Sequence, residues 1–142
     1  MTKRSGRSAE NDDVLASVLN AGTKKICLVG KTHDFHVKTA LGISLKENIE
    51  AIRQSISHVV SMGREAIFDA EHFFDGMLSN SDYAIEAIRS AYSAGARWIV
   101  LCDTNGGSLP REIEKAVSLA IEAGVPGCLL YTSDAADDSL RV

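Results

Sequence analysis

The sequence predicts an α/β fold built on a parallel sheet, and two observations carry this prediction. The first is a repeat, in which a segment with helical periodicity ends at a glycine and a short apolar run follows within a few residues. The glycines recur about every 30 to 40 residues, which is the length of a βα unit. The second is that polar residues follow the apolar runs, as they do at the ligand-binding edge of parallel sheets. The four glycines are Gly22, Gly63, Gly95 and Gly124.

A strand is expected two or three residues after each of these glycines. The run from Trp98 to Cys102 is apolar without alternation, which is typical of a strand covered on both faces. The other runs begin near Ile26, Ala66 and Cys128. Helix followed by strand, repeated along the chain, predicts parallel strands joined by right-handed crossovers.

The helices between the strands are marked by apolar residues three and four positions apart. Ser44 and Glu47 form a capping box at the start of the longest one, and Gly63 is its expected left-handed cap. Pro110 is placed in the first turn of the last one. The apolar faces run over Val14–Leu19, Leu45–Val59, Ile85–Tyr92 and Ile113–Ile121.

Length, charge and cysteine content limit the class of protein. A chain of 142 residues is at most one domain, and its net charge of −4 without a basic stripe argues against nucleic acid as a partner. Cys27, Cys102 and Cys128 form no CxxC pair, which indicates a reducing, cytoplasmic environment. No apolar run reaches the length of a membrane span and no signal peptide is recognised, so we expect a soluble protein without a membrane partner.

Three polar clusters follow the first three strands: Lys31–His36, Asp69–Gly76 and Asp103–Gly107. All three are expected on one rim of the sheet. A closed eight-stranded barrel would bring them to one pocket, whereas an open doubly wound sheet would spread them along an edge. Convergence on one pocket favours the barrel.

Each cluster has more than one interpretation. His33, Asp34 and His36 either ligate a metal or have an orienting or capping role, and the pattern lacks a third anchor for a metal. A phosphate-binding loop at Gly30 is excluded, because Lys25 stands where that motif needs its first glycine.

The two later clusters carry the candidate chemistry. Glu71 follows an apolar strand and either transfers a proton or caps the segment Phe73–Gly76. Asp103 and Thr104 either bind a substrate carboxylate or cap the helix that follows. The residues alone leave these alternatives open.

Three motifs together resemble the citramalate synthases, a family within the superfamily of isopropylmalate synthases, homocitrate synthases and hydroxymethylglutaryl-CoA lyases. The motifs are Lys31-Thr-His-Asp-Phe-His-Val37, Phe68-Asp-Ala-Glu-His-Phe-Phe-Asp-Gly76 and Leu101-Cys-Asp-Thr-Asn-Gly-Gly107. The resemblance covers residues 2 to 127. It implies a partial (β/α)8 TIM barrel, of which this chain holds the middle βα units.

The resemblance also implies an acyltransferase activity. Family members condense acetyl-CoA with pyruvate to (R)-citramalate, an entry to isoleucine and branched-chain amino acid biosynthesis, with a divalent metal, Mg²⁺ or Mn²⁺, that binds the keto acid. They are usually homodimers. By this resemblance Glu71 is the catalytic glutamate and Thr104 contacts the keto acid's carboxylate. His36, Asp69 and Asp103 are supporting residues of the substrate pocket.

This sequence departs from the family pattern in ways that matter for activity. The family's metal ligands are an Arg-Asp pair on the first strand, a His-x-His on the seventh and a later asparagine, and none is present. We therefore expect residues 1–127 to be an internal fragment of the catalytic barrel that binds no catalytic metal and is inactive alone. Residues 128–142 resemble a translated sequencing adapter and are expected to be a non-native tail.

Two other functions remain open. One is a sister synthase that uses another keto acid, such as a 2-isopropylmalate or homocitrate synthase. The other is a non-catalytic α/β module that binds a small anion at the rim.

A partial barrel exposes two strand edges and part of its apolar interior, so we expect the isolated chain to aggregate or fold poorly.

Overall fold

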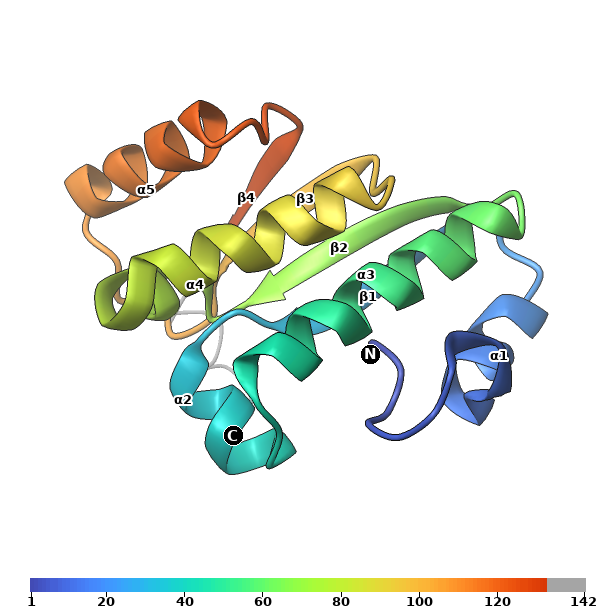
Figure 1. Cartoon of the computed structure of the whole chain (residues 1–142). Coiled ribbons are helices and arrows are strands. Elements are labelled where there is room, and N and C mark those ends of the chain that lie inside the picture. Colours follow the sequence, from blue (N-terminus) through green and yellow to red (C-terminus); the bar gives the residue numbers. More distant parts are fainter. Residues whose placement is uncertain (133–142) are drawn as a thin grey trace, which may run out of the picture.

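The computed structural model describes residues 1–132 and contains a four-stranded parallel sheet with flanking helices (Figure 1). The strands lie in chain order, and each pairs in parallel with the next. All four expected strands are present. They are β1 (Lys25–Lys31), β2 (Glu65–Glu71), β3 (Trp98–Asp103) and β4 (Cys128–Thr132).

The expected helices are also present, and one is longer than its pattern indicated. The element that contains the helix marked by Ile85 to Tyr92 begins at Phe73 and is kinked at Asn80, whose φ of −154° and ψ of 81° are not helical, so a first helical segment from Phe73 meets the expected helix there. Ser44 and Glu47 form the expected capping box, and Gly63 has a left-handed φ of 72°. The long helices are α1 (Asp13–Asn20), α3 (Leu45–Ser61), α4 (Phe73–Ser93) and α5 (Pro110–Glu122). The short ones are η1 (Ala9–Asn11), α2 (Asp34–His36) and the π-helical η2 (Val37–Leu41).

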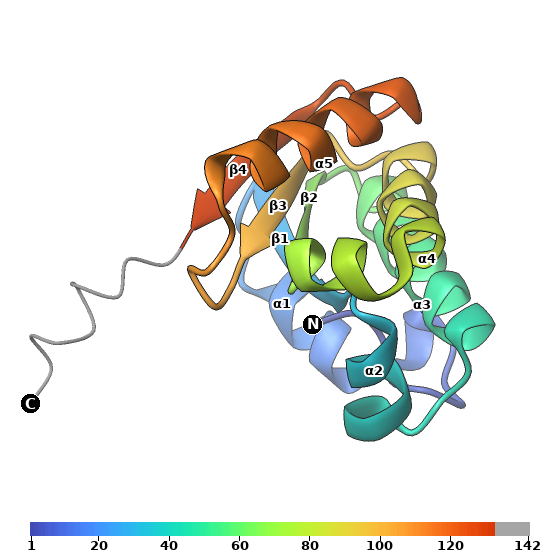
Figure 2. The same ribbon diagram turned by 90° about the vertical axis from the view of Figure 1, so that its left-hand side faces the viewer.

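The core lies between one face of the sheet and the helices α3, α4 and α5, which lie together on that face (Figures 1 and 2). Leu28, Phe68 and Leu101 are fully buried there, together with Ile56 of α3 and Ile88 of α4. Apolar side chains on alternate strand positions thus meet the apolar stripes of the helices, and their removal from water supplies the main stabilisation.

The opposite face of the sheet is less covered than the sequence indicated. Trp98 and Val100 are only half-buried, whereas Ile99 and Leu101 between them are fully buried. The prediction that this strand is covered on both faces is therefore wrong for part of its length. In the part of the chain that the structure describes, α3, α4 and α5 lie together on the first face of the sheet (Figure 2).

The strand order distinguishes the two folds that the sequence left open. In a doubly wound sheet the order reverses at a switch point and helices cover both faces. Here the order is β1-β2-β3-β4 without a reversal, which is the order of a barrel. Within residues 1–132 no helix is long and apolar enough to cross a membrane.

The N-terminal segment lies along the edge of β1. The backbone N–H of Thr2 donates to the carbonyl of Val29 at 3.1 Å, and Lys3 N donates to Ser55 Oγ at 2.8 Å. The fully buried Asp12 holds this segment to α1, because its carboxylate accepts from the backbone N–H groups of Arg4 and Leu15. Burial alone would raise the pKa of Asp12, but these hydrogen bonds and the Arg4 guanidinium lower it to about 2.

Candidate functional site

Residues at the carboxyl ends of β2 and β3 line a pocket of about 230 Å³. Parallel strands place their carboxyl ends on one rim, so the polar residues that follow them are brought together. Three of the predicted site residues share this pocket. It is lined by Val29, Asp69, Glu71, Cys102, Thr104 and Tyr131.

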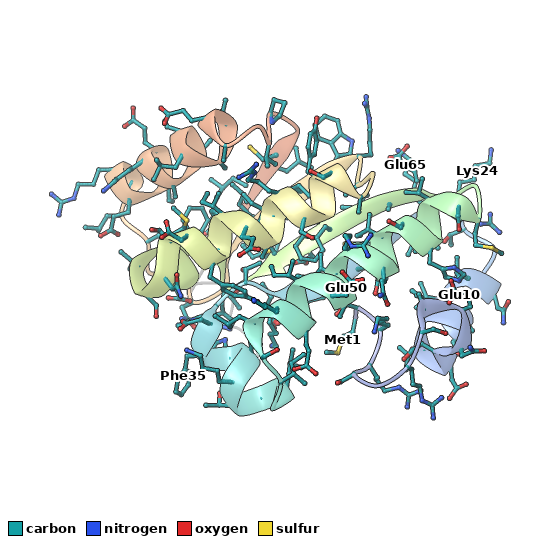
Figure 3. All side chains as sticks on the ribbon, viewed as in Figure 1. Met1, Glu10, Lys24, Phe35, Glu50 and Glu65 are labelled. Atoms are coloured by element: carbon teal, nitrogen blue, oxygen red, sulfur yellow. The ribbon has the colours of Figure 1, made fainter. Side chains whose placement is uncertain are left out.

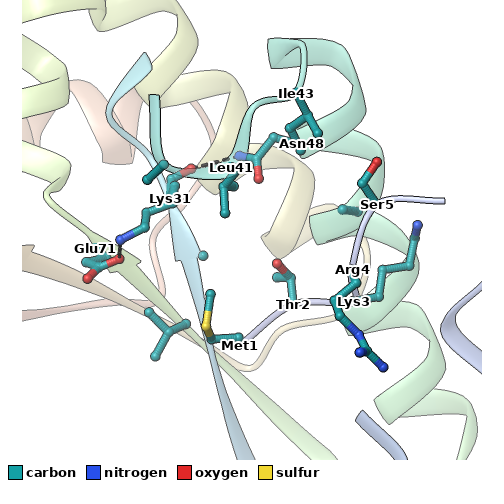
Figure 4. A pocket seen from close by; sticks show the side chains of 14 residues that line it. Met1, Thr2, Lys3, Arg4, Ser5, Lys31, Leu41, Ile43, Asn48 and Glu71 are labelled. Carbon is teal, nitrogen blue, oxygen red and sulfur yellow. Dashed lines mark hydrogen bonds and ion pairs between the residues drawn. The ribbon is translucent and has the colours of Figure 1, made fainter. Parts of the chain in front are cut away.

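The Glu71 carboxylate is held by the ammonium group of Lys31 at the neighbouring end of β1 (Figure 4). The two residues are register partners, and both side chains are largely buried, at 20% and 28% exposed. Asn48 Nδ2 donates to the carbonyl of Lys31 at 2.8 Å and so anchors α3 to this strand end. Glu71 also lines a second pocket of about 210 Å³, on the side of the N-terminal segment.

Glu71 does not cap the segment that follows it. The N-cap of α4 is His72, and no side chain makes a capping hydrogen bond there. The capping alternative for Glu71 is therefore wrong. Its carboxylate is instead directed along the rim toward Lys31, with the pocket beside it.

Thr104 is fixed by the residue that follows Glu71. The backbone N–H of His72 donates to Thr104 Oγ1 at 3.0 Å and joins the β2 and β3 ends. His72 has φ 56° and ψ 37°, and it is the one residue other than glycine with positive φ in residues 1–132. A left-handed conformation costs a side-chain-bearing residue about 1–2 kcal/mol, so the surrounding contacts must maintain it.

Asp75 supplies those contacts. Its Oδ2 lies 2.8 Å from His72 Nδ1 and accepts from Asn105 Nδ2 at 2.9 Å. One carboxylate oxygen thereby connects the loop after β2 with the loop after β3. The N-cap of α5 is Leu109, and the Thr104 hydroxyl bonds the backbone of His72 and not the start of that helix. The helix-capping alternative for Thr104 is therefore wrong.

Asp69 accepts a hydrogen bond from the thiol of Cys102 across the β2–β3 pair, with Sγ–Oδ1 at 2.8 Å. Burial raises the pKa of Cys102, and the hydrogen bond and charge of Asp69 raise it further. The thiol therefore stays protonated and serves as a donor, not as a nucleophile. It holds one oxygen of Asp69 at the wall of the pocket.

Asp103 is almost fully buried, at 4% exposed, and stabilises the loop after β3. Its carboxylate accepts from Ser108 N at 3.2 Å, from Ser108 Oγ at 3.0 Å and from Thr132 Oγ1 at 3.1 Å. It does not cap α5, whose Leu109 N–H is bonded by Glu112 at 2.8 Å. Asp103 lies outside the lining of the pocket and supports the loop that carries Thr104.

His36 lies outside the lining of the pocket, next to two other imidazoles. Its ring centroid is 4.4 Å from that of His72 and 4.8 Å from that of His33. Its Nδ1 is buried without a hydrogen-bond partner among the described residues. Burial lowers the pKa of His36, and the nearby His72, His33 and Lys31 lower it further.

In the first polar cluster, Lys31–His36, the side chains of His33 and Asp34 bond to residues of the loop that follows β1. His33 is the N-cap of α2 and accepts from Phe35 N at 3.3 Å, while Asp34 pairs with Lys38 at 3.0 Å. Phe35 extends from α2 at the carboxyl rim, at the opposite end of the sheet from Glu65 (Figure 3). These contacts fit the orienting alternative, and no group of three or more His, Cys, Asp or Glu in residues 1–132 is arranged for a metal ion.

Sequence reasoning did not find the residues that hold the site together. Asp75 lay inside a recognised motif but carried no assigned role, and the left-handed His72 has no sequence signal because it is not a glycine. The cross-strand partner of Asp69 was also missed, since a cysteine in an apolar run is usually a small core residue.

Comparison with known proteins gives one matching family. The HMGL-like family matches residues 6–129. The (R)-citramalate synthase of Synechocystis is 45% identical over 114 residues, and that of Streptomyces coelicolor is 42% identical over 120 residues. These matches cover 80% and 84% of this chain but 21% and 22% of the relatives. The chain thus spans about a fifth of the length of these relatives.

More distant matches include a 2-isopropylmalate synthase and a solved lyase. The synthase, from Prochlorococcus marinus, is 31% identical over 102 residues, which are 72% of this chain and 18% of that protein. The HMG-CoA lyase of Bacillus subtilis superposes with a TM-score of 0.73 at 18% identity, over 89% of this chain and 44% of that one. At this identity the structural likeness concerns the fold, which is that of a partial barrel.

Proposed function

The chain belongs to the HMGL-like family, and we propose that it forms part of the active site of a synthase that condenses acetyl-CoA with pyruvate to (R)-citramalate. The observation that carries this proposal is the difference in identity, 45% to a citramalate synthase against 31% to a 2-isopropylmalate synthase. The pocket that contains Asp69, Glu71 and Thr104 supports it. We also propose that the full-length enzyme is cytoplasmic, from the cysteine content, and homodimeric, from the family resemblance.

In the proposed reaction, a base removes a proton from the acetyl methyl group and the resulting enolate attacks the ketone carbon of pyruvate. Hydrolysis of the thioester then releases citramalate and CoA. We assign proton transfer to Glu71, whose carboxylate is held at the pocket by Lys31. We assign binding of the pyruvate carboxylate to the hydroxyl of Thr104.

The divalent metal implied by the family would act as a Lewis acid on the keto acid when bound. The described residues do not fit such an ion, because none of their His, Cys, Asp and Glu side chains forms a group that could hold it. No step is therefore assigned through a metal held by this chain. In the proposed full-length enzyme its ligands lie in other parts of the barrel.

A hybrid enzyme tests the proposal. Residues 6–127 of this chain replace the aligned segment of the Synechocystis (R)-citramalate synthase, and CoA release is measured with pyruvate, 2-oxoisovalerate and 2-oxoglutarate. We expect kcat/KM for pyruvate to exceed the others by about tenfold or more. A matched hybrid with the corresponding segment of the Prochlorococcus marinus 2-isopropylmalate synthase serves as the control.

Two results would contradict the proposal. A folded hybrid that prefers 2-oxoisovalerate or 2-oxoglutarate would favour the sister synthase. A folded hybrid that releases no CoA, but binds pyruvate in calorimetry without Mn²⁺, would favour the small-anion-binding module.

A further inference from the structure

We propose that His72, held by Asp75 and Asn105, is a positioning residue that directs the hydroxyl proton of Thr104 into the pocket. The inference rests on the proposed function, in which Thr104 binds the carboxylate of the keto acid. It assigns a role to a strained residue and to a link between two loops that the proposed function does not use.

The first step concerns the Thr104 hydroxyl. A hydroxyl group has one donor and two acceptor positions, and the His72 N–H occupies one acceptor position of Thr104 Oγ1 at 3.0 Å. Among residues 1–132 no hydrogen bond uses the hydroxyl of Thr104 as a donor. Its proton is therefore free for a ligand in the pocket that Thr104 lines.

The second step concerns the backbone of His72. Its N–H reaches Thr104 because the residue is left-handed, with φ 56° and ψ 37°. A residue with a side chain leaves this conformation unless its contacts oppose the change. The hydrogen bond between the His72 ring and Asp75 holds His72 in the left-handed conformation at the first turn of α4.

The third step connects the two loops. The same oxygen of Asp75 accepts from Asn105, which is the residue after Thr104. Asp75 thus holds both sides of the His72–Thr104 hydrogen bond, one through the His72 ring and one through Asn105. Removing the Asp75 carboxylate frees both loops and leaves the Thr104 hydroxyl without a fixed direction.

The first test uses the full 142-residue chain and does not depend on activity. Hydrogen exchange of the His72 amide is compared between the unchanged chain and Thr104→Val, which removes the acceptor but keeps the shape. We expect exchange about five- to tenfold faster in Thr104→Val, as for the loss of one hydrogen bond. Equal exchange rates would overturn the inference, because His72 would then not donate to Thr104.

The second test uses the hybrid enzyme and its pyruvate kinetics. Asp75→Ala is expected to lower kcat/KM for pyruvate about five- to tenfold, mainly through KM, with KM for acetyl-CoA unchanged. His72→Gly should retain more activity than His72→Ala, because glycine adopts positive φ without strain. Asp82→Ala, an exposed carboxylate on the same helix, is the matched control and should change neither constant.

A double-mutant cycle separates positioning from general stabilisation. In the Thr104→Val background Asp75→Ala should have no further effect on KM for pyruvate, whereas in Thr104→Ser the effect should remain. The inference is overturned if Asp75→Ala lowers kcat/KM equally in all three backgrounds. If the unchanged hybrid makes no citramalate, the proposed function fails, and the exchange result still decides whether His72 fixes Thr104.

Discussion

At the scale of single residues, the candidate site depends on contacts between neighbouring strands and between the loops that follow them. Asp69, Glu71 and Thr104 were expected at strand ends and share one pocket. Strand-end position can be read from sequence because the residue that follows an apolar run must lie at the rim. The partners of these residues could not be predicted, since Lys31 and Cys102 approach them across neighbouring strands. Such pairs depend on strand register, which no local pattern determines.

His36 leads to a prediction about acid stability. Its pKa is lowered in the folded chain, so the unfolded chain binds the proton more readily and stability falls as the pH drops below the ordinary histidine range. We expect the thermal midpoint of the hybrid enzyme to fall between pH 7.5 and 5.5, and to fall less in His36→Asn. The control is His58→Asn, a substitution on α3 outside the site. If the thermal midpoint fell equally in His36→Asn and in the unchanged hybrid, His36 would not be the source of the loss of stability at low pH.

At the scale of elements, the helices and strands followed their patterns closely. The capping box at Ser44, the left-handed Gly63 and Pro110 at the start of α5 are where the sequence placed them. The extension of α4 back to Phe73 was not expected, because the backbone of Asn80 is not helical and interrupts the periodic pattern there. The π-helical turn η2 was missed as well, since it leaves no periodicity of its own in five residues.

The first turn of α4 depends on a glycine for its closeness to β1. A Cβ on Gly76 would lie 2.5 Å from the carbonyl oxygen of Thr32, which is backbone and cannot move aside. We expect Gly76→Ala to destabilise the fold by about 1–3 kcal/mol and to displace α4 from the pocket. The thermal midpoint and kcat/KM of the hybrid enzyme measure both effects.

Gly107→Ala is the matched control for this substitution. A Cβ there meets nothing within 4 Å, and the backbone does not have positive φ. A Gly76→Ala hybrid as stable and as active as Gly107→Ala would mean that α4 does not need this close approach.

At the scale of the whole molecule, the chain has the fold of a partial barrel, and its edge strand β4 differs from β1 and β2. Leu129, Leu130 and Tyr131 of β4 are 47%, 49% and 60% exposed, whereas every second residue of β1 and β2 is buried. The family match also ends at residue 129. These observations support our proposal that residues 128–142 are a non-native tail, although the part beyond Thr132 lies outside the described residues. Resequencing the source locus across the Gly127 codon tests it.

The exposed side chains of β4 predict self-association of the isolated 142-residue chain. Apolar edge strands pair with other chains unless charge or coverage prevents it. We expect sedimentation velocity to show species larger than a monomer as the concentration rises, and Leu130→Lys to reduce them. Leu78→Lys, at an exposed position on α4, should have no such effect. A chain that stays monomeric at all concentrations and unfolds sharply would contradict this prediction.

The central claim is that the pocket at the ends of β2 and β3 performs the condensation, and Glu71→Gln in the hybrid enzyme tests it most directly. The matched control is Glu65→Gln, because Glu65 forms a similar ion pair with Lys25, at 3.2 Å, at the opposite end of the same two strands. We predict that Glu71→Gln lowers kcat for citramalate formation about a hundredfold or more, while Glu65→Gln leaves it within about twofold. Equal rates in the two variants would contradict the claim that Glu71 transfers the proton at this pocket.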